Sequence, residues 1–451
     1  MATSVPKSKW KGMEIDSLNT GSGSIGSITI SYVGKRPEST ILATPPGEYV
    51  KIYSEGKKDN RLYFGENLKV LSALLNDPAV AGKVTLIYID PPFATGGVFK
   101  SRKQEDAYAD LLQGAEYIEF MRQRLILLRE LLSEMGSIYV HLDTNMVFAV
   151  KLIMDEIFGE NNFRNLITRK KCNPKNYTRK TYGNISDYIL FYTKSDTYIW
   201  NRAFEPWSEE DARREYPYID EKTGRRYKKV PIHAPGTRDG ETGQPWRGMM
   251  PPPGKHWQYT PRKLDEMDKR GEIYWSPTGN PRRKIFLDDS PGKPVQDIWL
   301  DVKDAHNQNI RITGYPTEKN PLLLERIIKA SSRPGDIVLD CFCGSGTTLS
   351  VAEILERRWI GVDNSPQAII TTLKRFAVGT KAMGDFVSTK TKIKHPSQMT
   401  LFEPDDIHND SVGTSVENSN TKIRNFSFYC DSKIQKHLPD EIYKWLELSA
   451  K

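Results

Sequence analysis

The chain has 451 residues, which is enough to bury one large hydrophobic core or two smaller ones. Its hydrophobic content of 38% without a long apolar span disfavours a membrane protein, and no secretory signal is visible. The four cysteines show neither disulfide nor zinc spacing, so we expect no metal site and a reducing, cytoplasmic location. The net charge of +8 suggests a polyanionic partner, although net charge alone is weak support.

The first half of the chain alternates strand and helix patterns. Residues 1–45 are rich in Gly and Ser and are expected to be flexible. Apolar spacing then predicts, in order, a strand at 62–64, a helix from 68, a strand at 84–89, a helix at 115–134, a strand at 137–142 and a helix ending at 158. This alternation favours a Rossmann-like, doubly wound and mostly parallel α/β sheet.

The alternation stops after Gly159 and returns with Asn320-Pro321. Residues 161–300 hold 27 Lys and Arg against 18 Asp and Glu, together with 20 of the 46 aromatic residues, a mixture that suits nucleic-acid contacts. Residues 200–300 are dense in turn formers and are interpreted as an inserted, irregular recognition region. Patterns then predict a helix at 322–330, a strand at 336–339, a helix to 356, a strand at 359–362, a polar linker at 403–424 and a terminal helix at 440–448.

Five segments are therefore expected. The ends are a flexible N-terminal segment and a polar linker with a C-terminal tail, and two halves of a catalytic domain flank the recognition region. In chain order the bounds are 1–45, 46–200, 201–300, 301–385 and 386–451.

A glycine turn, 342–348, lies between the strand at 336–339 and the next helix. Glycines let the backbone turn tightly and approach a ligand. Asp363, at the end of the strand that follows, could accept hydrogen bonds from ribose hydroxyls. A nucleotide-like cofactor is thus favoured over a tight turn that binds nothing. A nicotinamide dinucleotide stays open, although the third glycine of its fingerprint is missing.

A second motif ends the strand at 84–89. Asp90 and Phe93 flank two prolines, Pro91 and Pro92, so a carboxylate and an aromatic ring are held at a strand end. This arrangement is a plausible seat for a flat base that carries an amino group. An ordinary strand-to-turn sequence is the alternative.

Together the two motifs resemble the amino-methyltransferases of DNA, whose cofactor motif D-x-F-C-G-S-G-T-T is matched by residues 340–348. The resemblance implies S-adenosylmethionine as cofactor, with its methionine part in the turn and its ribose on Asp363. The implied cofactor residues in the turn are Asp340, Phe342, Cys343, Gly344, Ser345, Gly346 and Thr347. Tyr315-Pro316-Thr317-Glu318-Lys319 resembles a further motif in which Thr317 and Lys319 would lie near the methionine end, although Asn320 replaces the usual proline.

Asp90-Pro91-Pro92-Phe93 matches the catalytic D-P-P-Y/F motif of the same family. The resemblance implies that Asp90 and the Pro91 carbonyl accept hydrogen bonds from an adenine amino group, whose nitrogen is otherwise a poor nucleophile. Phe93 would stack on the base after it is flipped out of the duplex.

The motif order, with the catalytic motif first and the cofactor motif last, is that of β-class enzymes. Two phrases, Ile87–Gly96 and Leu152–Gly159, look most like the modification subunits of type III restriction systems. The chain is shorter than expected for such a subunit, so a type II or solitary role stays open.

The basic stretch 161–186 and the 200–300 region are expected to contact double-stranded DNA. Arg169, Lys170 and Lys171 are the chosen phosphate contacts, whereas three tryptophans are expected more often in a small core than on bases. These are Trp246, Trp257 and Trp275.

The sequence therefore predicts an adenine-N6 DNA methyltransferase, cytoplasmic in a prokaryote or phage-like setting and associated with the nucleoid. Cytosine-N4 methylation is the rival reaction, and Asp90 disfavours it because that chemistry usually goes with S-P-P-Y/F. A catalytically silent nucleic-acid-binding module and an RNA target are further alternatives. A restriction subunit and a second copy of the chain are candidate partners.

Overall fold

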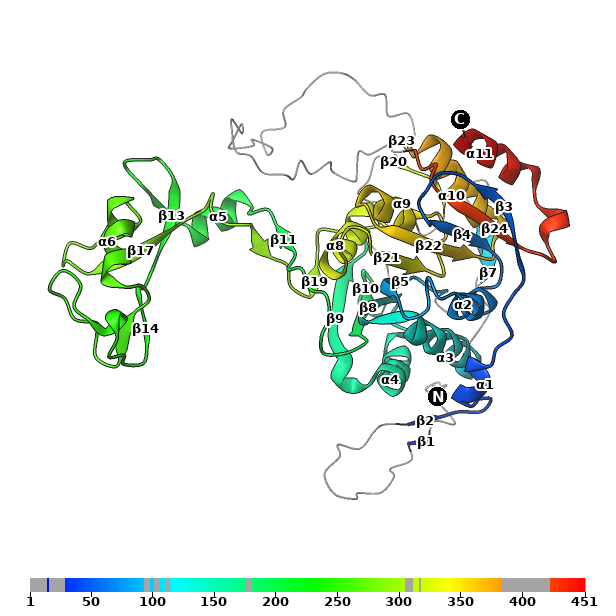
Figure 1. Cartoon of the computed structure of the whole chain (residues 1–451), viewed down its shortest axis with the longest axis horizontal. Helices are drawn as coiled ribbons and strands as arrows, with labels where there is room; N and C mark the ends of the chain where they lie inside the picture. The colour runs from blue at the N-terminus through cyan, green and yellow to red at the C-terminus, as the bar shows by residue number, and fades with distance from the viewer. Residues whose placement is uncertain are drawn as a thin grey trace. The chain divides into compact units, whose positions relative to one another are not determined.

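The computed structural model describes most of the chain (Figure 1). The described residues are 14–15, 29–92, 98–100, 106–109, 114–174, 180–304, 311–315, 318–382 and 422–450. Two of the expected site residues, Phe93 and Thr317, lie outside them. The chain separates into two compact units, the first made of residues 1–201 with 296–451 and the second of residues 202–295.

The first unit is built on a ten-stranded sheet. Its strand order is β19-β9-β10-β8-β5-β21-β22-β4-β24-β3, and six neighbours from β8 to β24 run parallel. This confirms the expected mostly parallel sheet. In sheet order the bounds are Ile298–Trp299, Phe163–Lys170, Ser186–Thr193, Leu132–Leu142, Val84–Ile89, Ile337–Asp340, Arg358–Asp363, Arg61–Phe64, Ser427–Asp431 and Tyr49–Ser54.

Helices cover both faces of this sheet, which explains why the sequence of β5, V-T-L-I-Y-I, is apolar throughout and entirely buried. On one face α2 packs on α3 and α3 on α4, while α8 and α9 pack together on the other (Figure 1). The helix bounds are α2 Asn67–Leu75, α3 Gly114–Leu131, α4 Val147–Phe158, α8 Pro321–Ser331, α9 Thr347–Ile354 and α10 Pro366–Val378. Short pairs complete the unit: β1 Glu14–Ile15 with β2 Ile30–Ser31, β6 Val98–Lys100 with β7 Asp106–Ala109, and β20 Arg311–Ile312 with β23 Lys381–Ala382.

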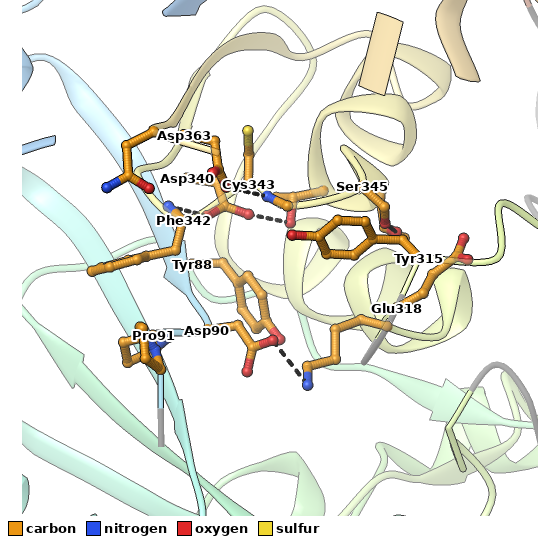
Figure 2. Close-up of a pocket in the computed structure, with 16 residues that line it drawn as sticks. Tyr88, Asp90, Pro91, Tyr315, Glu318, Asp340, Phe342, Cys343, Ser345 and Asp363 are labelled. Carbon is orange, nitrogen blue, oxygen red and sulfur yellow. Dashed lines mark hydrogen bonds and ion pairs between the residues drawn. The ribbon is translucent and has the colours of Figure 1, made fainter. Parts of the chain in front are cut away.

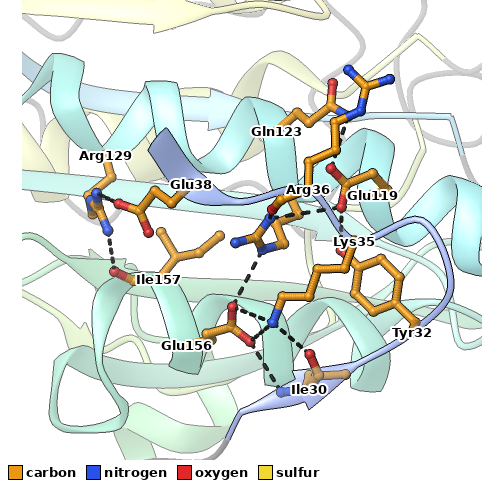
Figure 3. Close-up of polar contacts among 11 residues, drawn as sticks. Ile30, Tyr32, Lys35, Arg36, Glu38, Glu119, Gln123, Arg129, Glu156 and Ile157 are labelled. Atoms are coloured by element: carbon orange, nitrogen blue, oxygen red, sulfur yellow. Dashed lines mark hydrogen bonds and ion pairs between the residues drawn. The ribbon is translucent and has the colours of Figure 1, made fainter. Parts of the chain in front are cut away.

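The N-terminal segment departs from its expected flexibility from residue 29 onward. Figure 3 shows it lying along α3 and α4. The Tyr32 hydroxyl donates to Glu119 at 2.5 Å, and the Lys35 ammonium lies 2.8 Å from Glu156. A short helix, α1 (Glu38–Leu42), then begins with Glu38, which pairs with an arginine of α3. These polar contacts hold the segment in place although its sequence lacks a long apolar pattern.

The C-terminal segment also differs from the expected tail. Strand β24 enters the central sheet between β4 and β3, and its alternate residues Phe428 and Cys430 are buried. The expected terminal helix is present as α11 (Asp440–Ala450), which packs on α10. Residues 422–450 are therefore part of the core domain and not a polar appendage.

The second unit is more regular than the sequence indicated. It contains a four-stranded antiparallel sheet in the order β12-β13-β17-β16, and its own core includes Trp246 and Trp257, with Trp275 packed against them. The expectation that these tryptophans form a small core is confirmed. The bounds are β11 Phe204–Glu205, α5 Glu209–Glu215, β12 Tyr218–Ile219, β13 Arg226–Val230, β14 His233–Pro235, β15 Lys255–Trp257, α6 Pro261–Lys269, β16 Ile273–Trp275, β17 Pro281–Phe286 and β18 Lys293–Pro294.

In neither unit do the described residues include a helix with the length and apolar character that crossing a bilayer requires.

Candidate active site

The two motifs lie close together at the carboxyl ends of neighbouring strands in the central sheet. Strands β5, β21 and β22 are parallel neighbours, so the residues that follow their carboxyl ends converge although Asp90 and Asp340 are far apart in sequence. A pocket with about 760 Å³ of empty space, including its opening to solvent, lies between them (Figure 2).

Asp90 lines this pocket and comes directly after β5. Its Oδ2 lies 2.8 Å from the Lys319 ammonium, and both side chains are mostly buried. Its Oδ1 is buried too and has no hydrogen-bond partner within the described residues. Pro91 and Pro92 also line the pocket, and neither can donate a backbone hydrogen bond. The site thus presents a carboxylate oxygen that is ready to accept a hydrogen bond.

The glycine turn forms the opposite wall of the pocket. Gly344 and Gly346 have φ values of 51° and 72°, in the left-handed region that favours glycine. A Cβ on Gly346 would also come within 2.8 Å of the Thr372 side chain. That threonine in turn donates to the Gly344 carbonyl at 2.9 Å, so the turn is fitted closely against α10.

Asp340 stabilises the glycine turn through two hydrogen bonds. Its carboxylate accepts hydrogen bonds from the Phe342 amide at 3.0 Å and from the Thr348 hydroxyl at 2.6 Å. Burial raises the pKa of Asp340 to about 7, because these hydrogen bonds only partly offset the lost hydration and Asp90 and Asp363 add repulsion. Asp340 therefore shapes the turn as well as lining the pocket.

Asp363 completes the wall at the end of β22. Its two carboxylate oxygens accept the backbone amides of Gly344 at 2.9 Å and Ser365 at 2.8 Å. Burial raises its pKa despite these bonds. Each oxygen keeps a second lone pair, so the fixed carboxylate can still accept a hydroxyl from the pocket side.

The sequence matches the DNA methylase family over residues 84–374, more than half of the chain. The type II methyltransferase M.EcaI of Enterobacter cloacae is 50% identical over 379 residues, which cover 83% of each chain. The chain belongs to this DNA methylase family. It is therefore an S-adenosylmethionine-dependent DNA methyltransferase, as the sequence predicted.

Two other relatives are more distant. The Mod subunit of the type III enzyme StyLTI, from Salmonella typhimurium LT2, is 29% identical over 382 residues. The matched region covers 75% of this chain and 56% of that subunit. A crystal structure of an M1.HpyAVI complex with SAM is 16% identical, with a TM-score of 0.39 over 70% of this chain and 98% of that one.

Two residues of the methyltransferase site were missed by sequence reasoning. Arg375 on α10 donates to the Ser345 carbonyl at 2.7 Å and to the Thr347 hydroxyl at 3.1 Å, and it pairs with Glu318. Glu318 also accepts from the Thr313 amide at 2.8 Å. The pair thus ties the glycine turn to the segment that carries Lys319. Arg375 lies in α10, the second helix after the turn, and belongs to no sequence motif that would have indicated this role.

The cysteines of the turn behave as packing residues. Cys341 and Cys343 are buried, and burial raises the pKa of both thiols, so they stay protonated. No cluster of His, Cys, Asp and Glu within the described residues could hold a metal ion.

The expectation that Arg169 contacts DNA phosphate does not fit the structure. Its side chain is fully buried, with Nε 2.8 Å from Asp187 Oδ1 and Nη2 2.6 Å from Asp187 Oδ2. Nη2 also lies 2.6 Å from Asp304. A guanidinium committed to two carboxylates inside the domain cannot reach a phosphate. Lys170 and Lys171 are half-buried at the end of β9 and keep their assignment as a hypothesis.

Proposed function

We propose that the methyltransferase modifies the N6 amino group of adenine in double-stranded DNA. The observation that carries this proposal is the buried Asp90 Oδ1, which lines the pocket without a hydrogen-bond partner among the described residues. An amino hydrogen of the base would supply that partner. The bond would draw electron density toward the nitrogen, whose lone pair is otherwise delocalised into the ring.

The opposite wall would hold the cofactor. S-adenosylmethionine supplies an electrophilic methyl group on sulfur. The turn at Gly344 and Gly346 allows close approach of its methionine part, and Asp363 offers a carboxylate for the ribose hydroxyls. The target base would have to leave the duplex, at a cost of a few kcal/mol. Placing both reactants within one pocket would then lower the entropic part of the barrier.

Cytosine-N4 methylation is the rival, because a cytosine amino group could donate to the same oxygen. Asp90 itself supports adenine, since the family resemblance associates cytosine-N4 transfer with serine at this position. A silent binding module is disfavoured by membership of a family of DNA methylases.

The second unit offers a surface for the DNA backbone. Lys229 on β13 lies 3.6 Å from the ring centres of both Tyr218 and Tyr274, and Arg282, the cross-strand neighbour of Tyr274, is exposed. Neither cation is paired with a carboxylate within the described residues. We therefore assign this face of the four-stranded sheet to phosphate contacts, in place of Arg169.

A restriction partner, a homodimer, and a cytoplasmic location with nucleoid association remain predictions. Size-exclusion chromatography with light scattering at several concentrations would decide between a monomer and a dimer.

The test is to incubate the protein with methyl-labelled cofactor and genomic DNA and then digest the DNA to nucleosides. Label in N6-methyladenine is expected, and label in N4-methylcytosine would move the proposal to the rival reaction. Asp90→Ala should abolish transfer while cofactor binding persists. Loss of cofactor binding in that variant would contradict the assignment of separate base-binding and cofactor-binding parts to the pocket.

A further inference from the structure

A chain of buried polar groups lies directly behind Asp90. His141, the second-last residue of β8, is fully buried. Its Nδ1 lies 2.8 Å from the Tyr88 hydroxyl and 3.9 Å from Asp90 Oδ1, and its Nε2 lies 2.9 Å from Asp187 Oδ2. The imidazole thus lies between the pocket carboxylate that follows β5 and a second carboxylate on β10.

The far end of this chain is held rigidly. Asp187 is directly opposite Arg169 in the β9–β10 pairing, and the two side chains form a bidentate ion pair. Burial opposes ionisation of Asp187, but His141 and Arg169 outweigh it and hold the pKa of Asp187 well below its usual range. Asp187 therefore stays anionic and faces the imidazole.

Stability alone does not require such a chain. Moving charged groups out of water carries a large free-energy cost for each ion, and apolar replacements of buried ion pairs are often as stable. The groups lie on or directly after four neighbouring strands, β5, β8, β10 and β9, and the chain ends in the pocket. A role in the pocket chemistry explains its position better than a packing role does.

The charges of this cluster leave room for one proton. Lys319 and Arg169 carry two positive charges, whereas Asp90, Asp187 and Asp304 carry three negative ones. With a neutral imidazole the cluster has a net charge of −1, and with a protonated imidazole it is neutral. Imidazole is the side-chain group whose ordinary chemistry includes both the neutral and the protonated form near neutral pH.

Methyl transfer to an amino group releases one proton. The nitrogen lone pair forms the new N–C bond, the electrons of the S–C bond stay on sulfur, and one N–H proton must leave the nitrogen. Asp90 Oδ1 is placed to receive that proton. We propose that His141, held by Asp187, then takes it from Asp90, so that the His141–Asp187 pair serves as the proton acceptor behind the catalytic carboxylate.

This inference rests on the proposed amino-methylation. The 3.9 Å between Asp90 Oδ1 and His141 Nδ1 is longer than a hydrogen bond, and a movement of about 1 Å would close it. The Tyr88 hydroxyl, which can donate to Nδ1 while the ring is neutral, would rotate away when that nitrogen is protonated. Among the described residues, the charged groups that face the ring are Asp90, directly after β5, Asp187 from β10 and, behind Asp187, Arg169 from β9.

The kinetic test is single-turnover methyl transfer as a function of pH. His141→Gln keeps an amide donor for Asp187 but cannot take up a proton. The rate is expected to fall about 100-fold, in the range of general acid–base effects, while cofactor and DNA binding stay unchanged. If the imidazole must accept a proton during the reaction, the wild-type rate should fall toward low pH, and this fall should be absent from the variant. Equal rates and pH profiles would overturn the proposal.

Tyr139→Phe is the matched control. Tyr139 is buried in the same strand and loses one hydrogen bond, to Ser331 at 2.7 Å, but it is not part of the chain behind Asp90. Its rate and pH profile should match those of the wild type. A loss equal to that of His141→Gln would mean that any disturbance of β8 impairs the site, which would also overturn the proposal.

An independent measurement needs no turnover. Selective ¹⁵N labelling of the seven histidines, with His141 assigned by its missing signal in His141→Gln, follows the ring by NMR as pH changes. Asp90→Asn removes a neighbouring negative charge, so His141 should lose its proton at lower pH in that variant. An unchanged midpoint would contradict the coupling. Absence of any methyl incorporation by the wild type would instead reject the proposed function itself.

Discussion

The Lys319 ammonium lies 2.8 Å from the Asp90 carboxylate and joins the two halves of the active site, which are widely separated in sequence. Lys319 leads into α8 after the Tyr315 motif, whereas Asp90 directly follows β5. Because both side chains are largely shielded from water, their attraction is stronger than that of a surface ion pair. The pair keeps a negatively charged oxygen at the place where the base amino group is expected.

Lys319→Met should therefore impair transfer. The substitution keeps the side-chain length and removes the charge, which leaves the Asp90 carboxylate without this cation. We expect at least a tenfold loss of single-turnover rate. A double-mutant cycle with Asp90→Asn, measured by urea unfolding, should show a coupling free energy of about 1–3 kcal/mol. Additive effects of the two substitutions would mean that the observed ion pair contributes nothing in solution.

Alanine substitutions at Gly344 and Gly346, the two left-handed positions of the turn, should differ in their effect on stability. An alanine at Gly346 adds backbone strain and a clash with Thr372, whereas an alanine at Gly344 meets nothing nearer than Tyr315 at 3.5 Å. Gly346→Ala should therefore lower the free energy of unfolding more than Gly344→Ala does. Adding Thr372→Ala should recover part of that loss. If the double variant shows only the sum of the two single losses, the clash is not the cause.

The raised pKa of Asp340 should make the free energy of unfolding depend on pH. Its folded pKa of about 7 lies above the ordinary aspartate value of 3.8. Between these values the folded protein holds a proton that the unfolded chain has lost, so this group makes stability fall as pH rises, by about 1.4 kcal/mol for each pKa unit. Asp340→Asn removes the effect. Its stability relative to the wild type should be greater at pH 8 than at pH 5.

Urea unfolding at the two pH values measures this difference. Asp196→Asn is a suitable control, because that aspartate is 87% exposed. The control should change little with pH relative to the wild type. An Asp340→Asn variant whose relative stability is the same at pH 5 and pH 8 would show that the buried carboxyl has an ordinary pKa.

Sequence patterns predicted the parts of the site that are local. The apolar run of β5, the two prolines and the glycine turn each depend on neighbouring residues, and the parallel sheet then brought Asp90 and Asp363 to one edge. The His141 contacts could not be predicted, because they depend on the register of three strands. Strand β24 was missed for a similar reason, since this short strand follows a polar segment and pairs with β4, near the opposite end of the chain.

Arg169 shows how a charge pattern can mislead. It stands in a stretch with seven basic and no acidic residues, which suggested exposure. In β9, however, it shares a face with buried Ile167, two positions earlier, and its cross-strand neighbour is Asp187. A charge opposite a carboxylate on a buried face is a structural pair, and only the strand register distinguishes it from a DNA contact.

The final prediction separates these two roles. Arg169→Met leaves Asp187 and Asp304 without their shared cation, so the free energy of unfolding should fall by about 3–5 kcal/mol. Lys171→Ala, at a half-buried side chain, should change stability by less than about 0.5 kcal/mol. It should instead weaken DNA binding at every sequence and lower the salt dependence by about one counterion. Stable Arg169→Met protein with selectively weakened DNA binding would restore the phosphate-contact hypothesis, because removing one partner of a buried ion pair should leave the other charge unpaired at a cost to folding.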